Sequence, residues 1–264
     1  MHRWFSDLFV LFTISLATSA TVLAQEACPK VVISADPAYP PLHWYDGQHF
    51  QGASITLTTK ALNAIGVPFE FRYLGPWKRV LIAAENGSID LVTSLKDTPE
   101  RREFLTFSLP LLSNPVAVFV RKGESFSFAK KEDLIGRRGG VARGNRFGQP
   151  FDSFMDEHLQ VEVTHNMETS FRMLIANRFD YVLTGYYPAT NALMTSKLDL
   201  RIQAVKPFVT ETANLVGFVS KSPCLKYLNA FNEQIDKMRK NGDIDRELKK
   251  ATEEWRRHPM LHKD

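Results

Sequence analysis

The chain has 264 residues, of which 44% are hydrophobic and 23% charged, and its formal net charge is +4. This composition is typical of a folded globular protein and excludes a disordered or collagen-like chain. The mean hydropathy of -0.21 excludes a polytopic membrane protein. The pI of about 9.0 is only mildly basic, and no nucleic-acid-binding motif accompanies it, so we expect no nucleic-acid partner.

Residues 1–24 have the pattern of a secretory signal peptide. His2 and Arg3 give it a positive start, and Leu8–Leu16 form an apolar segment. That segment is too short to cross a bilayer, which takes roughly 20 residues. Small residues then lead to a cleavage site after Ala24. We therefore predict an exported protein whose mature chain begins at residue 25.

The sequence contains two cysteines, Cys28 and Cys224. In an exported chain such a pair indicates one disulfide, with two buried free thiols as the alternative. Two cysteines without a cluster of histidines do not indicate a zinc site, and the histidines share no ligand spacing. We expect no metal and no cofactor.

Strand-like and helix-like segments alternate after the leader. In the first half, strands are predicted at Val31–Ala35, Phe69–Tyr73 and Asp90–Thr93, and helices at Ile55–Ile65 and around Val80–Ala84, before the Asn86-Gly87 stop signal. In the second half, strands are predicted at Val116–Val120, Gly139–Ala142, Val161–Thr164, Tyr181–Thr184 and Leu215–Val219. Helices are predicted there after Arg146 and at Glu168–Asn177, Pro223–Lys240 and Ile244–Trp255. The alternation predicts two α/β units, each with a parallel-rich sheet flanked by helices.

Five short motifs follow one another along the chain. They are Asp36–Pro41 with Gly52, Glu85–Asp90 leading into Leu91–Ser94, Thr98–Arg101 followed by Phe107–Pro110, Gly139–Asn145, and Asn241-Gly242. In this order and spacing the chain resembles family 3 of the periplasmic solute-binding proteins, the polar amino-acid type, from about Val31 to Trp255.

The resemblance implies the two-lobed periplasmic binding protein fold (type II), in which two crossing strands join the lobes. Lobe one would comprise residues 25–114 and 215–264, and lobe two residues 115–214. The ligand would lie in the cleft between the lobes, which close on it by hinge motion. Both cysteines would then fall in lobe one, where a disulfide would fix the last helical region to the start of the first strand.

The resemblance also implies roles for individual side chains. Arg101 matches the arginine that grips a ligand carboxylate, for which a planar guanidinium offers two parallel hydrogen bonds. Tyr39 and Trp77 match the aromatic positions that sandwich the ligand. The remaining candidate ligand contacts are Asp36, Trp44, Ser94, Lys96, Arg143, Asn145, Arg146 and Tyr186. Arg102, in the same charged run as Arg101, is interpreted as a solvated side chain.

The resemblance implies an acidic residue that binds the α-ammonium group of a ligand, and this sequence has no acidic residue at that position. It would follow the strand Tyr181–Thr184, and the sequence has Gly185 there. An unpaired ammonium is costly in a desolvated cleft. The sequence therefore favours an anionic small molecule, such as a carboxylic or dicarboxylic acid. Asp36 and Glu211 remain as acids that would suit an α-amino acid.

The expected function is that of a monomeric periplasmic binding protein without catalytic activity, which delivers its small-molecule ligand to an ABC permease. Two alternatives stay open. One is a ligand-sensing partner of a membrane receptor. The other is an enzyme on the same fold, similar to cyclohexadienyl dehydratase, acting on prephenate or arogenate. That enzyme has a glutamate general acid after the lobe-two glycine turn, where this chain has Asn145-Arg146-Phe147.

Overall fold

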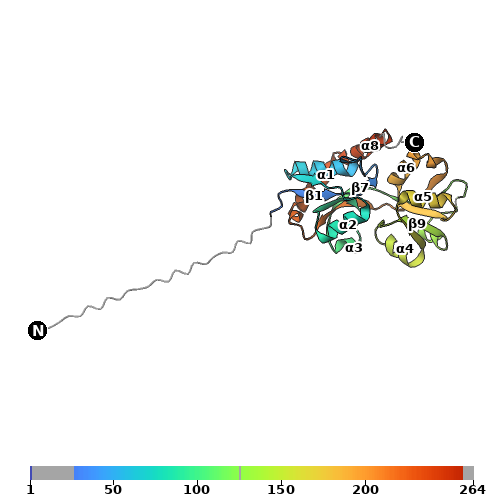
Figure 1. The fold of residues 1–264 in the computed structure, drawn as a ribbon, viewed down its shortest axis with the longest axis horizontal. Helices are drawn as coiled ribbons and strands as arrows, with labels where there is room; N and C mark the ends of the chain where they lie inside the picture. Colours follow the sequence, from blue (N-terminus) through green and yellow to red (C-terminus); the bar gives the residue numbers. More distant parts are fainter. Residues whose placement is uncertain (2–26, 125, 258–264) are drawn as a thin grey trace.

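The computed structural model describes residue 1 and residues 27–124 and 126–257, and the signal peptide predicted at residues 1–24 falls, after residue 1, outside that part. The described chain forms two lobes that lie side by side (Figure 1). Within it, every helix is too short or too polar to traverse a lipid bilayer.

Lobe one is built on a five-stranded sheet in the order β5-β1-β6-β13-β7. These strands are β1 (Val31–Ser34), β5 (Phe69–Phe71), β6 (Leu91–Leu95), β7 (Leu105–Ser113) and β13 (Ala213–Val219). β1 pairs in parallel with β5 and β6, whereas β13 pairs antiparallel with β6 and β7. A small antiparallel sheet of β2 (Ala38–Tyr39), β3 (His43–Tyr45) and β4 (Phe50–Gln51) follows β1. The helical segments are α1 (Ala53–Ala64), α2 (Trp77–Asn86), α3 (Pro99–Arg102), η3 (Pro223–Tyr227), α7 (Leu228–Lys240) and α8 (Asp243–Arg256).

Lobe two is built on a second five-stranded sheet, in the order β10-β9-β11-β8-β12. These strands are β8 (Val116–Arg121), β9 (Arg138–Ala142), β10 (Gln160–Thr164), β11 (Tyr181–Gly185) and β12 (Ile202–Thr210). β9 pairs in parallel with β10 and β11, and β8 pairs antiparallel with β11 and β12. The helical segments are η1 (Lys131–Leu134), α4 (Phe151–His158), α5 (Met167–Ile175), α6 (Tyr186–Thr195) and η2 (Leu198–Leu200).

Two short crossover segments connect the lobes. Residues 114–115 join β7 of lobe one to β8 of lobe two, and residues 211–212 lead from β12 back to β13. The strand that follows each crossover, β8 in lobe two and β13 in lobe one, runs antiparallel to both of its neighbours. This arrangement explains why both sheets are mixed, although the alternation of strands and helices along the chain predicts mainly parallel pairing.

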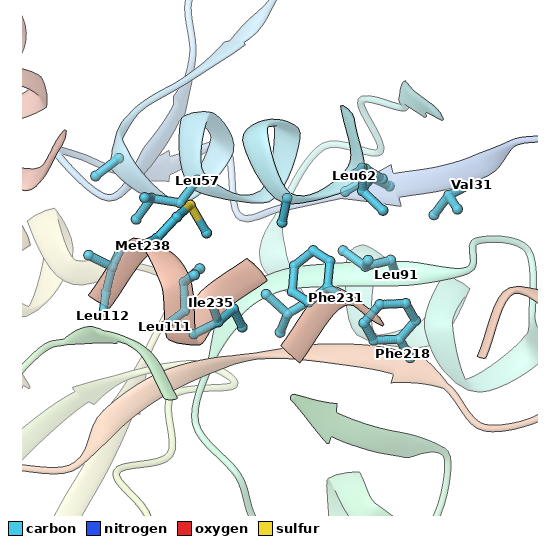
Figure 2. Close-up of a cluster of buried hydrophobic side chains, with 14 of the residues drawn as sticks. Val31, Leu57, Leu62, Leu91, Leu111, Leu112, Phe218, Phe231, Ile235 and Met238 are labelled. Carbon is cyan, nitrogen blue, oxygen red and sulfur yellow. The ribbon is translucent and has the colours of Figure 1, made fainter. Parts of the chain in front are cut away.

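The core of lobe one lies between its sheet and the helices α1 and α7 (Figure 2). Phe218 of β13 and Phe231 of α7 meet there edge to face, with 5.4 Å between ring centroids. The side chains of β1 alternate, so that Val31 and Ile33 enter this core while Val32 packs on the opposite face, against α2. The alternation buries both faces of the strand, as the short apolar run predicts.

Local sequence signals explain several element boundaries. α2 begins after Pro76 and ends at Gly87, whose φ of 79° is the left-handed conformation that glycine adopts readily. α3 begins after Thr98, whose side chain accepts a hydrogen bond from the Arg101 backbone N–H. Pro99 occupies the first turn, where its missing N–H costs nothing. The motif Thr98–Arg101 thus forms a capped turn that holds Arg101.

Several elements differ from the sequence prediction, which also contained no strands at β2, β3 and β4. β7 and β12 are long antiparallel strands that the helix–strand alternation does not reveal, because they form with partners distant in sequence. α6 starts directly after β11. The helix predicted at Pro223–Lys240 is divided into η3 and α7, because Ser222 caps a separate short turn through the Cys224 N–H.

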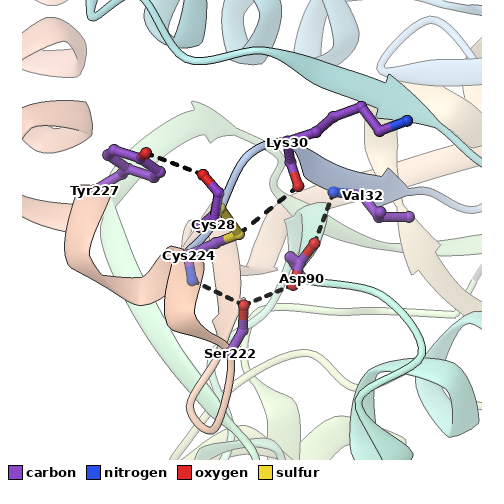
Figure 3. The surroundings of a disulfide bond; sticks show 7 residues. All are labelled: Cys28, Lys30, Val32, Asp90, Ser222, Cys224 and Tyr227. Atoms are coloured by element: carbon purple, nitrogen blue, oxygen red, sulfur yellow. Dashed lines mark hydrogen bonds between the residues drawn. A yellow bond between two sulfur atoms is a disulfide. The ribbon is translucent and has the colours of Figure 1, made fainter. Parts of the chain in front are cut away.

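The predicted disulfide joins Cys28 and Cys224, with 5.1 Å between their Cα atoms. Figure 3 shows the hydrogen bonds around it: the Tyr227 hydroxyl donates to the Cys28 carbonyl at 3.2 Å, and the Ser222 hydroxyl donates to Asp90 at 2.6 Å. Asp90 also accepts the Val32 N–H at 2.8 Å. The bond therefore attaches η3 to the chain just before β1.

Candidate functional site

A cleft lies between the lobes, and both lobes line it. Eight of the predicted ligand contacts lie there: Asp36, Tyr39, Trp77, Ser94, Lys96, Arg101, Asn145 and Arg146. They come from the segment after β1 including β2, from the end of β6 and the residue after it, from the start of α2, from α3, and from the loop after β9. Seven residues that the sequence did not single out as contacts also line the cleft: His43, Leu95, Asn114, Val116, Phe147, Gly185 and Asn214.

Arg101 is buried in this cleft, with 6% of its surface exposed. Its guanidinium donates to the Lys96 carbonyl at 2.7 Å and to the Gly144 carbonyl of lobe two at 3.1 Å. Burial lowers the pKa of Arg101 to about 10, so the group stays charged at neutral pH. A guanidinium carries five N–H donors, and the two hydrogen bonds to carbonyls leave others for a ligand carboxylate.

Trp77, at the start of α2, also contacts the lobe-two turn. Its indole N–H donates to the Gly144 carbonyl at 3.3 Å, the same oxygen that accepts from Arg101. The Arg101 guanidinium lies 5.6 Å from the centroid of the Trp77 ring, within cation–π range. Gly144 has a φ of 81°, and a Cβ there would lie 3.0 Å from the Trp77 ring. The glycine turn thus permits a close approach between the lobes.

Tyr39 reaches across the cleft to the end of β11. Its hydroxyl accepts a hydrogen bond from the Asn114 amide at 3.2 Å, and its ring stacks on His43 at 5.5 Å. A Cβ built on Gly185 would lie 2.3 Å from the Tyr39 hydroxyl. The Tyr39 hydroxyl therefore occupies the space into which an acidic side chain at residue 185 would project. Burial raises the pKa of Tyr39 to about 12, so the hydroxyl keeps its proton.

The contact between Tyr39 and Gly185 makes a testable prediction. Gly185→Ala is expected to lower the free energy of unfolding by about 1–3 kcal/mol, because the added methyl group overlaps the Tyr39 hydroxyl. The backbone is not the cause, since Gly185 has the ordinary φ of -62°. Denaturant unfolding measures the change. Tyr39→Phe in the same variant should recover part of the loss, and an alanine variant as stable as wild type would contradict the overlap.

Lys96 is also buried in the cleft, with 6% exposed surface. Its ammonium donates to the Asn114 carbonyl at 2.9 Å and to the Thr212 carbonyl. Burial lowers the pKa of Lys96 to about 7, Asp152 opposes that shift, and Arg101 adds to it. The predicted ligand contact is therefore already bonded to the protein backbone.

The acidic groups near the cleft differ in what they are free to bind. Both carboxylate oxygens of Asp152 accept backbone N–H groups, from Phe147 at 2.8 Å and Gly148 at 3.0 Å. Among the described residues, Asp36 accepts a hydrogen bond from the nearby Ala38 N–H at 2.9 Å, and burial raises the pKa of Asp36 to about 6. Asp36 is thus an acid that a ligand cation would meet in the cleft. Glu211 is exposed and does not line it.

His43 adds a neutral acceptor to the cleft. The Ser54 hydroxyl donates to the Leu42 carbonyl at 2.9 Å, so its oxygen accepts from His43 Nδ1, 3.0 Å away. That assignment leaves Nε2 without a proton, as a hydrogen-bond acceptor. Burial lowers the pKa of His43 to about 3, so the ring stays neutral.

Two further acceptors come from asparagine side chains of the crossover region. Within the described part of the chain, Oδ1 of Asn114 and Oδ1 of Asn214 are buried without a hydrogen-bond partner. The Asn214 amide nitrogen donates to the Ser94 hydroxyl at 3.1 Å and so holds Ser94, whose φ is 62°. Buried acceptors without partners are unfavourable, so these oxygens favour a ligand that carries hydrogen-bond donors.

Two predicted contacts, Trp44 and Tyr186, pack in the lobe cores and do not line the cleft. Trp44 is 1% exposed and packs in the core of lobe one against Trp255, because its strand directs it away from the cleft. Tyr186, in the first turn of α6, packs on Phe208 in a lobe-two core. Arg143 is exposed and lines a wider groove that shares Asp36, Tyr39, Trp77 and Asn145 with the cleft, so its role as a ligand contact stays a prediction.

Arg146 lines the cleft, but its charge is already paired. Its guanidinium donates to both oxygens of Asp156, at 2.9 and 3.2 Å. Among the described residues, no group of three or more histidine, cysteine, aspartate or glutamate side chains is arranged to hold a metal ion. The polar groups of the cleft that could bind a ligand are therefore chiefly the Arg101 guanidinium and the neutral acceptors of His43, Asn114 and Asn214.

Comparison with known proteins identifies the family. The family model described as bacterial extracellular solute-binding proteins, family 3, matches residues 31–254. The chain belongs to this family. The sequence of this solute-binding protein is 20% identical over 230 residues to the L-cystine-binding protein TcyJ of Escherichia coli K12, covering 85% of this chain and 82% of TcyJ.

Two solved structures illustrate how far the fold agrees. One is the amino acid ABC transporter substrate-binding protein AbpA from Streptococcus pneumoniae bound to L-arginine, with a TM-score of 0.69 and 18% identity over 86% of this chain and 96% of that chain. The other is a histidine kinase sensor domain with similarity to periplasmic binding proteins, with a TM-score of 0.69 and 22% identity over 84% and 95%. The predicted resemblance and the two-lobed α/β fold are confirmed.

Proposed function

We propose that this solute-binding protein captures a small carboxylate-bearing molecule, an amino acid or a related organic acid, in the periplasm. The observation that carries the proposal is Arg101, a buried guanidinium at the centre of the cleft whose hydrogen bonds reach both lobes. A carboxylate bound there would add charge-assisted hydrogen bonds. Closure of the lobes around the ligand would exclude water and strengthen those bonds.

The cleft favours an acid without an α-ammonium group. Gly185 offers no carboxylate, and Tyr39 fills the space beside it. The amide oxygens of Asn114 and Asn214 and the neutral His43 accept hydrogen bonds without carrying charge. These groups suit hydroxyl, amide or carboxylic acid donors. Asp36 is the acid that would pair with an ammonium if the ligand is an α-amino acid.

The proposed role after capture is delivery to an ABC transporter or presentation to a membrane sensor. The comparisons include a transporter substrate-binding protein and a kinase sensor domain with the same fold. An enzyme similar to cyclohexadienyl dehydratase has less support. The turn at residues 144–147 brings Asn145 and Arg146 to the cleft, and Asp152 behind it is already hydrogen bonded to the backbone.

Thermal unfolding with a panel of amino acids, hydroxy acids, dicarboxylates and aromatic acids tests the ligand class. A ligand at 100 times its dissociation constant adds about 2.7 kcal/mol to the free energy of unfolding. For a protein of this size the melting temperature should rise by about 5–10 °C. We expect the rise with acids that lack an ammonium group. A rise with α-amino acids alone would assign the ammonium to Asp36, and no rise with any compound would contradict the proposal.

A further inference from the structure

The Lys96 ammonium lies where both crossovers leave lobe one. Asn114, which accepts at 2.9 Å, belongs to the first crossover, and Thr212, the second acceptor, belongs to the second. Lys96 itself follows the last residue of β6, the central strand of the lobe-one sheet. A single side chain therefore ties both inter-lobe connections to one point on a rigid sheet.

Crossovers of this kind are the segments that bend when two lobes open and close. A hinge absorbs the motion as changes in φ and ψ at a few residues. Such changes reorient the peptide carbonyls of those residues. An ammonium bonded to the carbonyls of residues 114 and 212 therefore opposes the bending of either crossover.

The backbone of Lys96 is also connected to the contact between the lobes. Its carbonyl accepts from the Arg101 guanidinium, which donates to Gly144 of lobe two. Because Trp77 donates to the same Gly144 oxygen, the lobes are in contact in this arrangement. Lys96 thus connects the two crossovers, through its side chain, to the contact between Arg101 and Gly144, through its backbone carbonyl.

We propose that Lys96 is a positioning residue of the hinge, whose ammonium holds both crossovers in the conformation that closes the cleft. This inference rests on the proposed function in one respect, namely that closure of the lobes captures a solute. It assigns Lys96 a role that does not require contact with that solute, and it explains why a lysine is buried among backbone carbonyls.

Protonation should then regulate closure. Burial places the pKa of Lys96 at about 7, and ammonium donors bind carbonyls more strongly than neutral amine donors. The charged groups around it are Arg101, Arg146 and Asp152, with Asp97 beside it and Glu211 beside Thr212; Asp36 titrates in the same cleft. Raising the pH from 6 to 9 should remove the proton from Lys96 and so weaken its hold on the two crossovers. The experiment must separate this effect from the titration of Asp36 and the other neighbours.

The distance between the lobes measures hinge closure without any ligand. Glu103 in lobe one and Glu157 in lobe two are exposed and can be replaced by spin-labelled cysteines, since both native cysteines are in the disulfide. Double electron–electron resonance then gives the distance distribution. We expect the ratio of open to closed molecules to rise about tenfold between pH 6 and pH 9, the order expected for weakening a charged hydrogen bond.

Substitutions assign the effect to Lys96. Lys96→Met should give a broad, more open distribution, which changes with pH no more than that of Lys96→Arg. Lys96→Arg keeps its charge at pH 9, so any pH dependence left in it belongs to Asp36 or another neighbour. Lys221→Met is the matched control, because Lys221 also donates to a backbone carbonyl, that of Glu85 at 2.9 Å, but far from the crossovers. It should behave as wild type.

The outcomes separate this inference from the proposed function. A wild-type distribution unchanged between pH 6 and pH 9, or a Lys96→Met variant as closed as wild type, would overturn the hinge role. Equal pH dependence in wild type and Lys96→Arg would also overturn it. Because no ligand is present, these results hold whether or not the thermal panel finds an acid that binds.

Discussion

Replacing Cys28 and Cys224 with serine is expected to lower the free energy of unfolding by about 3–5 kcal/mol. The two residues are 196 positions apart, so the bond closes a loop that contains most of the described chain. In the chain-entropy account, a longer loop restricts the unfolded state more strongly. Denaturant unfolding of the oxidised protein and of the double-serine variant measures the difference, and the melting temperature should fall by about 6–20 °C.

The surrounding hydrogen bonds provide the control for the disulfide. Ser222→Ala removes the hydroxyl that donates to Asp90 and accepts the Cys224 N–H, but leaves the disulfide in place. It should cost about 1 kcal/mol. A reducing agent should destabilise wild type and leave the double-serine variant unchanged. Equal stability of wild type and the double-serine variant would refute the contribution of the bond.

Arg101→Ala is expected to weaken binding of any acid that stabilises the protein by at least about 30-fold. Removing one partner of a buried, hydrogen-bonded charge pair costs about 2–5 kcal/mol, because the other charge stays buried and unpaired. Arg101→Lys should recover little of the loss, since an ammonium lacks the planar fork that matches a carboxylate. Isothermal titration with an acid identified by the thermal panel measures the change.

Arg102→Ala is the matched control for Arg101. Arg102 is the next residue of the same short helix, its side chain is 67% exposed, and it is paired with Asp97 outside the cleft. Its removal should leave affinity within about twofold, because Arg102 does not line the cleft and its exposed ion pair contributes only about 0–1 kcal/mol to stability. Affinity that falls equally in both variants, or in neither, would remove the basis for placing the carboxylate at Arg101.

Several elements follow directly from local chemistry in the sequence. The apolar run beginning at Val31 forms β1, and α2 ends at the Asn86-Gly87 signal. The Thr98-Pro99 pair starts the short helix that carries Arg101. Such signals act within a few residues, so a single sequence reveals them. The order of five such motifs was enough to predict the family and the two-lobed fold.

The strands β7 and β12 could not be predicted in the same way. Each gains its stability from partners far along the chain, as in the pairing of Leu112 in β7 with Asn214 in β13. Trp44 and Tyr39 show the same limit for side chains. Both are aromatic residues of one small sheet, but Trp44 enters the core while Tyr39 reaches the cleft. Sequence type alone does not say which face of that sheet meets the other lobe.

The sequence by itself determined the fold family and the motif that carries Arg101, because these depend on residue type and short-range spacing, and the export signal with two cysteines indicated the disulfide. Only the tertiary structure decided what the cleft side chains do. It places the Tyr39 hydroxyl in the space beside Gly185 and directs the Lys96 ammonium to carbonyls 18 and 116 residues away. Those roles arise where the two crossovers converge, and convergence is a property of the folded chain.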